Sequence, residues 1–310
     1  MQSDGENVTG PMPHAGSGKI IAVYRGGTVT EEEFSKYIGF MSLMNQEYMN
    51  VEQYSPYQKT VLKPYIGHKV LASRLGEMSD EAKKILDTQV DTFYAYVKQA
   101  AEVDTALNKR MEEAGLSDSD IKYFFRLITA VGDAEVNKIT DDAVMAIFEE
   151  TRMDYYIVTL RHILVGTTDM SAGEVLRTEE AALHRIQEVK TKLEAGGDWH
   201  VLAKAYSDDP GSSDNGGLYE WQTAGGFITE FKHAVNEQAV GEIGVPVKTP
   251  YGYHVIQVEQ REEISFEKLT EDHKAAIRQM LASEAMERFM SNELEDLITE
   301  IDLSASNEEG

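Results

Sequence analysis

Apolar residues in the first half of the chain recur at every third or fourth position, which is the spacing of helices with one buried face. A short apolar, strand-like run begins at Lys19, ends in Gly26 and Gly27, and precedes this spacing. Thr30 has Glu33 three residues later, the sequence of a capping box, so we expect the first helix to begin there. Further helices are expected over residues 58–75, 79–115, 117–131 and 140–152, separated by Gly76, by Gly115 to Ser117, and by Gly132 and Asp133. The first half of the chain is therefore predicted to be mainly helical.

The spacing of apolar residues changes at Tyr155. The segment YYIVTLRHILV is rich in β-branched and aromatic residues, and every second residue from Val158 through His162 to Leu164 shares one face. This pattern predicts a buried strand that carries a histidine. A loop over 166–177, a helix that begins at Thr178, and a second short helix, DWHVLAKAYS, are expected to follow.

Three more short strands complete the predicted module. They lie around Tyr219 to Gln222, around Val245 to Lys248, and in YHVIQVEQ, where His254 shares a face with apolar residues. The order β-α-α-loop-β-α-β-β describes a compact α+β module of about 105 residues.

Helical spacing returns after Glu263. One long or broken helix is predicted from a cap at Ser265 to about Ile301, and its apolar stripe has no partner within its own segment. We therefore expect it to pack against the N-terminal helices, with the module inserted into one mainly helical domain. The predicted divisions are a flexible leader over 1–18, the helical domain over 19–154 and 263–303, the module over 155–262, and a disordered tail over 304–310.

Composition excludes several classes of function. The chain of 310 residues has 54 acidic and 29 basic side chains, a formal charge of −25, which repels nucleic acid and anionic lipid headgroups. Cationic clients or a high-salt setting would suit this charge better. The absence of cysteine excludes disulfides, thiolate nucleophiles and cysteine metal sites. A membrane-spanning helix needs about 18 consecutive apolar residues, and no run in the sequence is that long.

The histidines do not have the spacing of metal ligands. His162 and His254 are expected on the inward faces of two strands, without a nearby Glu-x-x-His pair, so a buried histidine pair is favoured over a metal site. No G-x-S-x-G elbow is present, so a serine hydrolase is not expected either.

The run GGLYEWQTAGGFITEF places large aromatic side chains beside glycines within a very acidic chain. Two interpretations are open from the residues alone. The aromatic groups either fill a corner of the core or line a pocket for something apolar and compact.

Several motifs resemble those of the parvulin family of peptidyl-prolyl cis/trans isomerases. The segments RHILV, LAKAYSDDPGSSDNGG and GEIGVPVKTPYGYHVI occur in the order and spacing of that family, with the aromatic run between them. The resemblance covers residues 157–262. The helical segments on both sides are similar in layout to the PrsA-type foldases of Gram-positive bacteria. The implied fold is a parvulin module, a four-stranded antiparallel sheet with surrounding helices, inserted into a helical chaperone-like domain.

The resemblance also implies which residues bind the proline of a substrate. Phe227 stands where the family usually has Met, and Phe231 stands at the family's Phe, so both are expected to contact the proline ring. Tyr219 stands at the usual Leu as another wall, and Trp221 belongs to the same substrate-binding run.

A second set of residues is implied to orient the site. His162 and His254 match the paired strand histidines of the family, and Thr249 matches a network hydroxyl. Asp209 occupies the position that is Cys or Asp among parvulins, beside the carbonyl that rotates.

The physics of the reaction fits such a site without a cofactor or metal. Twisting an amide costs about 18 to 20 kcal/mol, yet no covalent bond has to break. The twisted amide loses resonance and charge from its oxygen, so an apolar cup around the proline and a few polar groups are sufficient.

The departures from the family's pattern leave a second function open. Tyr219 and Phe227 are both larger than the usual residues, and an Asp and a Gly of the glycine-rich run are replaced by Leu218 and Glu220. The alternative to an isomerase is a chaperone or holdase that binds clients through a catalytically weak module. Phosphate recognition is not expected, because GTTDMSAGEVLR after the first strand contains a single arginine.

The PrsA-like layout implies an extracytoplasmic, surface-tethered foldase for newly secreted, proline-containing polypeptides. We expect a lipid anchor at the outer face of the cytoplasmic membrane, attached to a cysteine just before Gln2 in a precursor, with Met1 as a replacement. The oligomeric state is left open, with a dimer among the options.

Overall fold

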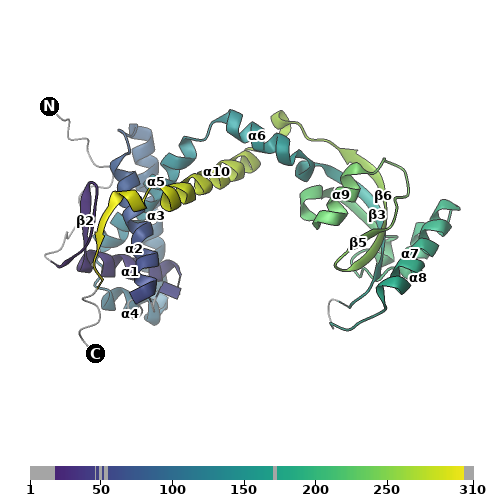
Figure 1. Cartoon of the computed structure of the whole chain (residues 1–310), viewed down its shortest axis with the longest axis horizontal. Helices are drawn as coiled ribbons and strands as arrows, with labels where there is room; N and C mark the ends of the chain where they lie inside the picture. The colour runs from purple at the N-terminus through teal and green to yellow at the C-terminus, as the bar shows by residue number, and fades with distance from the viewer. Residues whose placement is uncertain (1–17, 46, 49–50, 52–54, 170–172, 304–310) are drawn as a thin grey trace. The chain divides into compact units, whose positions relative to one another are not determined.

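The structure, a computed structural model, describes residues 18–45, 47–48, 51, 55–169 and 173–303. The predicted tail over 304–310, and all of the predicted leader except Gly18, lie outside the described residues. The chain divides into two compact units (Figure 1), one formed by residues 1–140 with 278–310 and the other by residues 141–277. The predicted module over 155–262 lies within the second unit, and its boundaries stay a prediction.

The first unit is mainly helical, with one small sheet. Its sheet has the antiparallel order β2-β1-β7. Its elements are β1 (Ile20–Tyr24), β2 (Gly27–Thr30), α1 (Glu31–Met44), α2 (Ser55–Ser73), α3 (Asp80–Val103), α4 (Thr105–Glu113), α5 (Asp118–Asn137), the part of α10 (Glu271–Asn292) from Arg278 onward, and β7 (Ile298–Ile301).

The core of the first unit combines distant segments of the chain. Phe40, Tyr65 and Phe124 are almost fully buried at its centre, and Phe289 and Leu294 from the C-terminal segment belong to the same apolar cluster. Phe289 and Leu294 of the C-terminal segment are therefore buried in one core with the N-terminal helices.

The helix at Thr30 begins as predicted, but the capping box is only half formed. The Thr30 hydroxyl accepts a hydrogen bond from the Glu33 backbone N–H at 3.2 Å. The Glu33 carboxylate accepts hydrogen bonds from the Tyr65 hydroxyl and the Lys69 ammonium instead. A charged partner and a buried phenol bind the carboxylate in place of the backbone group.

Two predicted helix boundaries are wrong. α5 continues through Gly132 and Asp133 to Asn137. A glycine within a helix costs about 1 kcal/mol relative to alanine. The burial of Val131 and Glu135, on either side of Gly132, outweighs this cost. The helix predicted over 79–115 breaks at Asp104, whose carboxylate caps α4 by accepting from the backbone of Ala106 and Leu107.

The prediction of a helix to Ile301 is also wrong. α10 ends at Asn292, and β7 pairs with β1, so that Ile301 lies opposite Ala22. This pairing supplies hydrogen-bond partners to the edge of β1, a non-local gain that the helical spacing cannot reveal.

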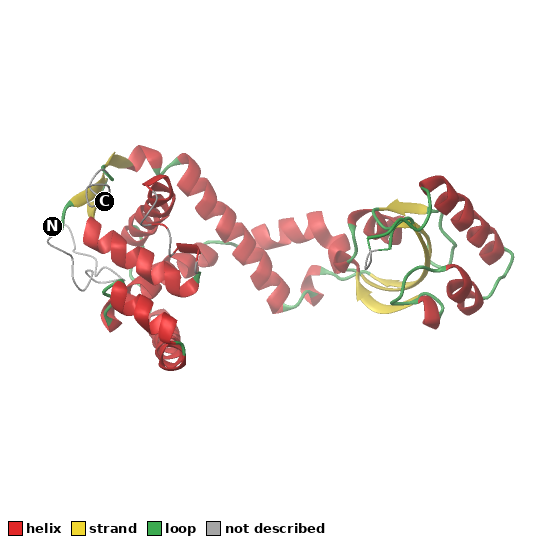
Figure 2. Ribbon diagram, turned by 90° about the horizontal axis from the view of Figure 1, so that it is seen from below, coloured by secondary structure: helices red, strands yellow, loops and turns green. Residues whose placement is uncertain are grey.

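The second unit contains the predicted four-stranded antiparallel sheet with surrounding helices (Figure 2), in the order β4-β3-β6-β5. β3 and β6 pair along their whole length, with Ile157 opposite Glu262, so the two ends of the predicted module lie side by side. Its elements are α6 (Asp141–Thr151), β3 (Ile157–Gly166), α7 (Glu179–Glu194), α8 (Trp199–Tyr206), β4 (Leu218–Thr223), α9 (Thr229–Glu237), β5 (Val247–Thr249), β6 (Gly252–Glu262) and the first turns of α10.

Both faces of this sheet are covered, because side chains along β3 alternate between two clusters. Ile163 and Val165 pack against α7 and α8 on one face. Val158 and Leu160 pack against Phe231 of α9 on the other. His162, the histidine of β3, lies on the face that α9 covers. A pocket opens on this same face.

Candidate active site

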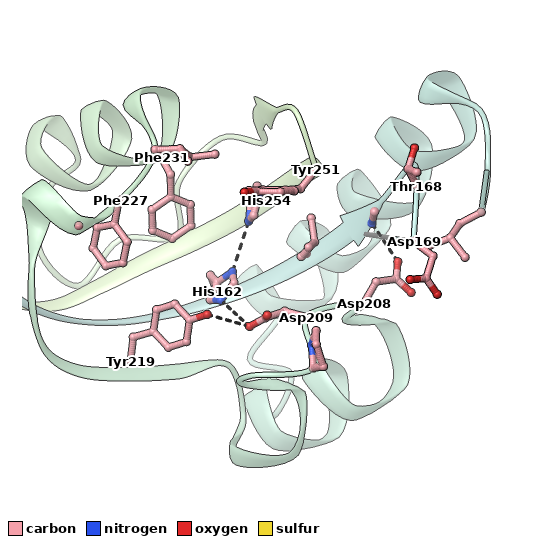
Figure 3. A pocket seen from close by; sticks show the side chains of 16 residues that line it. His162, Thr168, Asp169, Asp208, Asp209, Tyr219, Phe227, Phe231, Tyr251 and His254 are labelled. Atoms are coloured by element: carbon pink, nitrogen blue, oxygen red, sulfur yellow. Dashed lines mark hydrogen bonds and ion pairs between the residues drawn. The ribbon is translucent and has the colours of Figure 1, made fainter. Parts of the chain in front are cut away.

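A pocket of about 610 Å³ lies in the second unit beside β3, β6 and α9 (Figure 3). One end of the pocket is aromatic and the other carries carboxylates. Its lining residues are His162, Leu164, Gly166, Thr168, Asp169, Leu176, Asp208, Asp209, Pro210, Tyr219, Gly226, Phe227, Ile228, Phe231, Tyr251 and His254.

Three rings form the aromatic end. Tyr219 comes from β4, Phe227 from the turn after it, and Phe231 from α9. The Tyr219 and Phe227 rings are nearly parallel, with centroids 6.3 Å apart, and the Phe231 centroid lies 4.9 Å from that of Phe227. The structure therefore brings together three of the four predicted substrate-binding residues as the walls of one cup.

A chain of hydrogen bonds runs from the interior of the sheet to this cup. Thr249 Oγ1 lies 2.9 Å from His254 Nε2, and His254 Nδ1 lies 3.3 Å from His162 Nδ1. His162 Nε2 lies 3.1 Å from Asp209 Oδ2. All four residues predicted to orient the site are thus joined, although Thr249 lies behind His254 and does not line the pocket.

The protons along this chain have one consistent order when both rings are neutral. An ionised Asp209 can only accept, so His162 Nε2–H donates to it. His162 Nδ1 then accepts from His254 Nδ1–H, and His254 Nε2 accepts from the Thr249 hydroxyl. Burial, and next the nearby His162, lower the pKa of His254 to about 3, which keeps this ring neutral at ordinary pH.

Asp209 is held as a carboxylate by three side-chain donors. Its Oδ2 accepts from His162 Nε2, from the Tyr219 hydroxyl at 3.0 Å, and from the Ser212 hydroxyl. Burial alone would raise the pKa of Asp209, but the hydrogen bonds from His162, Ser212 and Tyr219 overcome it and hold the pKa well below its usual range. Burial, and next the charge of Asp209, raise the pKa of Tyr219 to about 12, so its hydroxyl stays a donor.

The loop that carries Asp209 is tied to β3. The Asp208 backbone N–H donates to the Leu164 carbonyl at 2.7 Å, and the Gly166 backbone N–H donates to the Asp208 carboxylate at 2.9 Å. Arg177 donates to the same carboxylate. Asp209 is therefore positioned by backbone contacts as well as by its own side chain.

A close backbone approach at Gly217 brings Tyr219 beside His162. Gly217 has φ +73°, and a Cβ there would lie 2.0 Å from the His162 carbonyl oxygen. The His162 N–H donates to the Gly217 carbonyl at 2.8 Å. Only glycine permits this approach, which leads directly into β4.

The structure places Trp221 outside the pocket. Two residues of β4, Glu220 and Trp221, lie opposite the single Thr159 of β3, which is a β-bulge. Trp221 takes φ +53°, its N–H donates to the Thr159 hydroxyl, and its side chain is 65% exposed. Of the residues predicted to bind substrate, this one is not among those that line the pocket.

Sequence reasoning missed two polar groups of the site. Ser212, which is 1% exposed, lies in a segment whose composition predicts only a loop. The resemblance implies Tyr219 only as a wall of the proline pocket, but its hydroxyl also donates a hydrogen bond to Asp209. The replacement of the family's Leu by Tyr was the available signal for the second group, and the residue types offered none for the first.

Within the part of the chain that the structure describes, no group of three or more His, Asp or Glu side chains is arranged to hold a metal ion. The site consists of an apolar cup, a pair of buried histidines and the carboxylate of Asp209, with the carboxylates of Asp169 and Asp208 at the far end of the pocket.

Comparison with known proteins agrees with this geometry. A model of the PPIC-type peptidyl-prolyl isomerase domain matches residues 145–262. The foldase protein PrsA of Geobacillus kaustophilus is 31% identical over 221 residues, which cover 67% of this chain and 68% of that protein. PrsA of Geobacillus sp. strain WCH70 is 28% identical over 267 residues, covering 85% of this chain and 80% of the relative. The crystal structure of the peptidylprolyl isomerase PrsA from Bacillus cereus has a TM-score of 0.50 and 25% identity, and covers 91% of this chain and 92% of that one.

The fold and the matched domain define a parvulin-type peptidyl-prolyl cis/trans isomerase. The chain belongs to the PrsA foldase family. It is accordingly an isomerase and a foldase that binds client polypeptides, and this family works outside the cytoplasm. No helix among the described residues is long and apolar enough to cross a membrane.

Proposed function

We propose that the pocket beside His162 is the site of proline isomerisation, with Tyr219, Phe227 and Phe231 around the proline ring and Asp209 beside the rotating amide. One observation carries this assignment: the hydrogen-bond chain from the sheet interior ends on a carboxylate at the rim of the aromatic cup. The parvulin motifs support the same assignment.

The cup favours the twisted amide over the planar one. A planar amide is strongly polar, and the barrier of about 18 to 20 kcal/mol is the loss of its resonance. Phe231, which is 4% exposed, and its aromatic neighbours present little that would solvate this polar ground state. A site that binds the twisted form better than the planar form lowers the barrier.

Asp209 adds an electrostatic contribution. The planar amide holds more negative charge on its oxygen than the twisted one, so a nearby carboxylate disfavours the planar form. The hydroxyl groups of Tyr219 and Ser212 fix this carboxylate in place without cancelling its charge. His162 and Thr249 therefore act as positioning residues, and Asp209 is the group that faces the reacting amide.

The large side chains do not close the cup. Tyr219 and Phe227 replace smaller residues of the family, yet a pocket of about 610 Å³ remains, within the usual range for small-ligand sites. This opening supports turnover in preference to a module that only holds clients. Trp221, exposed on β4, is available to clients outside the cup.

We further propose that the clients are unfolded, newly secreted segments that contain proline, and that a lipid anchor before Gln2 tethers the foldase to the outer face of the membrane. Family membership supports both statements. Radiolabelled fatty acid incorporated by the natural precursor, and lost when its first cysteine is replaced, would support the anchor. An upstream sequence without such a cysteine would contradict it.

The test of the site is the slow, proline-limited refolding of a model protein. We expect the full chain to accelerate this phase, and expect Asp209→Ala and Phe231→Ala to lower the acceleration at least tenfold while far-ultraviolet circular dichroism shows a folded chain. Glu194→Gln, at an exposed position of α7, serves as the matched control. Full activity in both alanine variants would refute the assignment.

A further inference from the structure

We infer that the pocket prefers proline segments in which a residue adjacent to the proline is lysine or arginine, and that Asp169 is a specificity-determining residue. This inference rests on the proposed function of the pocket and adds the class of substrate to it.

The two ends of the pocket differ in chemistry (Figure 3). The rings of Phe227 and Phe231 lie at one end, the carboxylates of Asp169 and Asp208 lie at the other, and Asp209 lies between them. A proline in the aromatic cup would therefore direct a neighbouring residue along the pocket toward these carboxylates. No lysine or arginine occurs among the described residues that line the pocket.

The balance of charge in this region is negative. Arg177 pairs with Asp208, and the formal charges of Asp169, Asp208, Asp209 and Arg177 sum to −2. The Tyr219 and Ser212 hydroxyls that donate to Asp209 are neutral, so they stabilise its charge without removing it. A cationic side chain of a substrate would be the complementary group.

The rest of the chain strengthens this preference. Its formal charge of −25 attracts cationic segments and repels anionic ones at long range. A phosphorylated or acidic residue beside the proline would face Asp169 at close range, and like charges disfavour such a complex.

The experiment uses the full chain and peptides of one sequence that differ beside the proline. One series places Lys, Gln or Glu directly before the proline, and a second series places them directly after it. The cis/trans exchange rate is measured by nuclear magnetic resonance, without a coupling protease. In at least one series, at low salt, we expect kcat/KM for the Lys peptide to be about fivefold higher than that for the Gln peptide. We expect it to be about tenfold higher than that for the Glu peptide. Both ratios should shrink toward one in about 1 M salt, where the screening length is only about 3 Å.

Two variants link the preference to the acidic end. Asp169→Asn should lower the Lys to Glu ratio severalfold, and Thr168→Lys, which introduces a cation at the same end, should reverse it. Glu194→Gln on α7 removes one charge outside the pocket and should leave the ratio unchanged.

The outcomes separate this inference from the proposed function. Equal rates for Lys, Gln and Glu in both series, with activity that still depends on Asp209, would overturn the inference alone. A preference that neither Asp169→Asn nor Thr168→Lys alters would also overturn it. Absence of exchange with every peptide would refute the proposed function, and the inference with it.

Discussion

Replacing Tyr219 with phenylalanine tests whether its hydroxyl holds Asp209. The change keeps the ring beside Phe227 but removes the donor that lies 3.0 Å from Asp209 Oδ2. A hydrogen bond to a charged group contributes about 1.5 to 3 kcal/mol. Tyr219 is only half-buried, so we take the lower end, about 1.5 kcal/mol, as the expected loss in the free energy of unfolding.

Activity should fall as well, because Asp209 loses one of three donors and part of its fixed orientation. Since about 1.4 kcal/mol corresponds to a tenfold change, we expect kcat/KM for a proline peptide to fall about fivefold, with only part of the lost energy affecting the reaction. Denaturant unfolding and peptide exchange measure the two effects. Tyr253→Phe is the control, because its hydroxyl makes no hydrogen bond to any residue that the structure describes.

The pH dependence of this variant has a defined sign. The pKa of Asp209 is lower in the folded chain than in the unfolded chain, where it is about 3.9. The ionised carboxylate therefore stabilises the fold fully at pH values above about 3.9. This contribution is lost as the pH falls toward the folded pKa. Removing a donor raises the folded pKa. The stability difference between the two proteins should therefore stay constant at neutral pH and narrow only below the variant's own pKa for Asp209, which carboxyl resonances can follow. Unchanged stability, activity and Asp209 titration would refute the reasoning.

Three further predictions concern the framework around the site. A fragment of residues 141–277 should melt at a higher temperature than a fragment of residues 155–262, because the shorter fragment lacks Phe148. Phe148 is 1% exposed, and burial of such a side chain contributes about 1.5 to 3 kcal/mol to stability. Equal melting temperatures would contradict this prediction. Gly217→Ala should disrupt the sheet and abolish activity, since its Cβ would lie 2.0 Å from a backbone carbonyl, and a folded, active variant by circular dichroism and peptide exchange would show the approach to be dispensable. Leu294→Ala, in the core of the first unit, should cost about 2 to 5 kcal/mol in unfolding yet leave peptide isomerisation intact, and a matching loss of isomerisation would be inconsistent with a self-contained catalytic unit.

The sequence by itself determined the order of most elements and the residue types of the site. Alternation around His162 and His254 predicted the two central strands, since residues two apart in a strand share one face. The local cap at Thr178 predicted the start of α7, where its hydroxyl accepts from the Ala181 backbone N–H. Such signals lie within a few residues of the feature they specify.

Tertiary structure decided the features that depend on distant partners. β7 exists because β1 offers an unpaired edge, and α5 passes through Gly132 because neighbouring side chains are buried there. At the site, Ser212 and Tyr219 meet at one oxygen of Asp209, and a bulge in β4 turns Trp221 away from the cup. Residue types predicted which groups belong to the site, but the backbone approach at β3 and β4 decided which of them touch, because hydrogen bonds require positions correct to a fraction of an ångström.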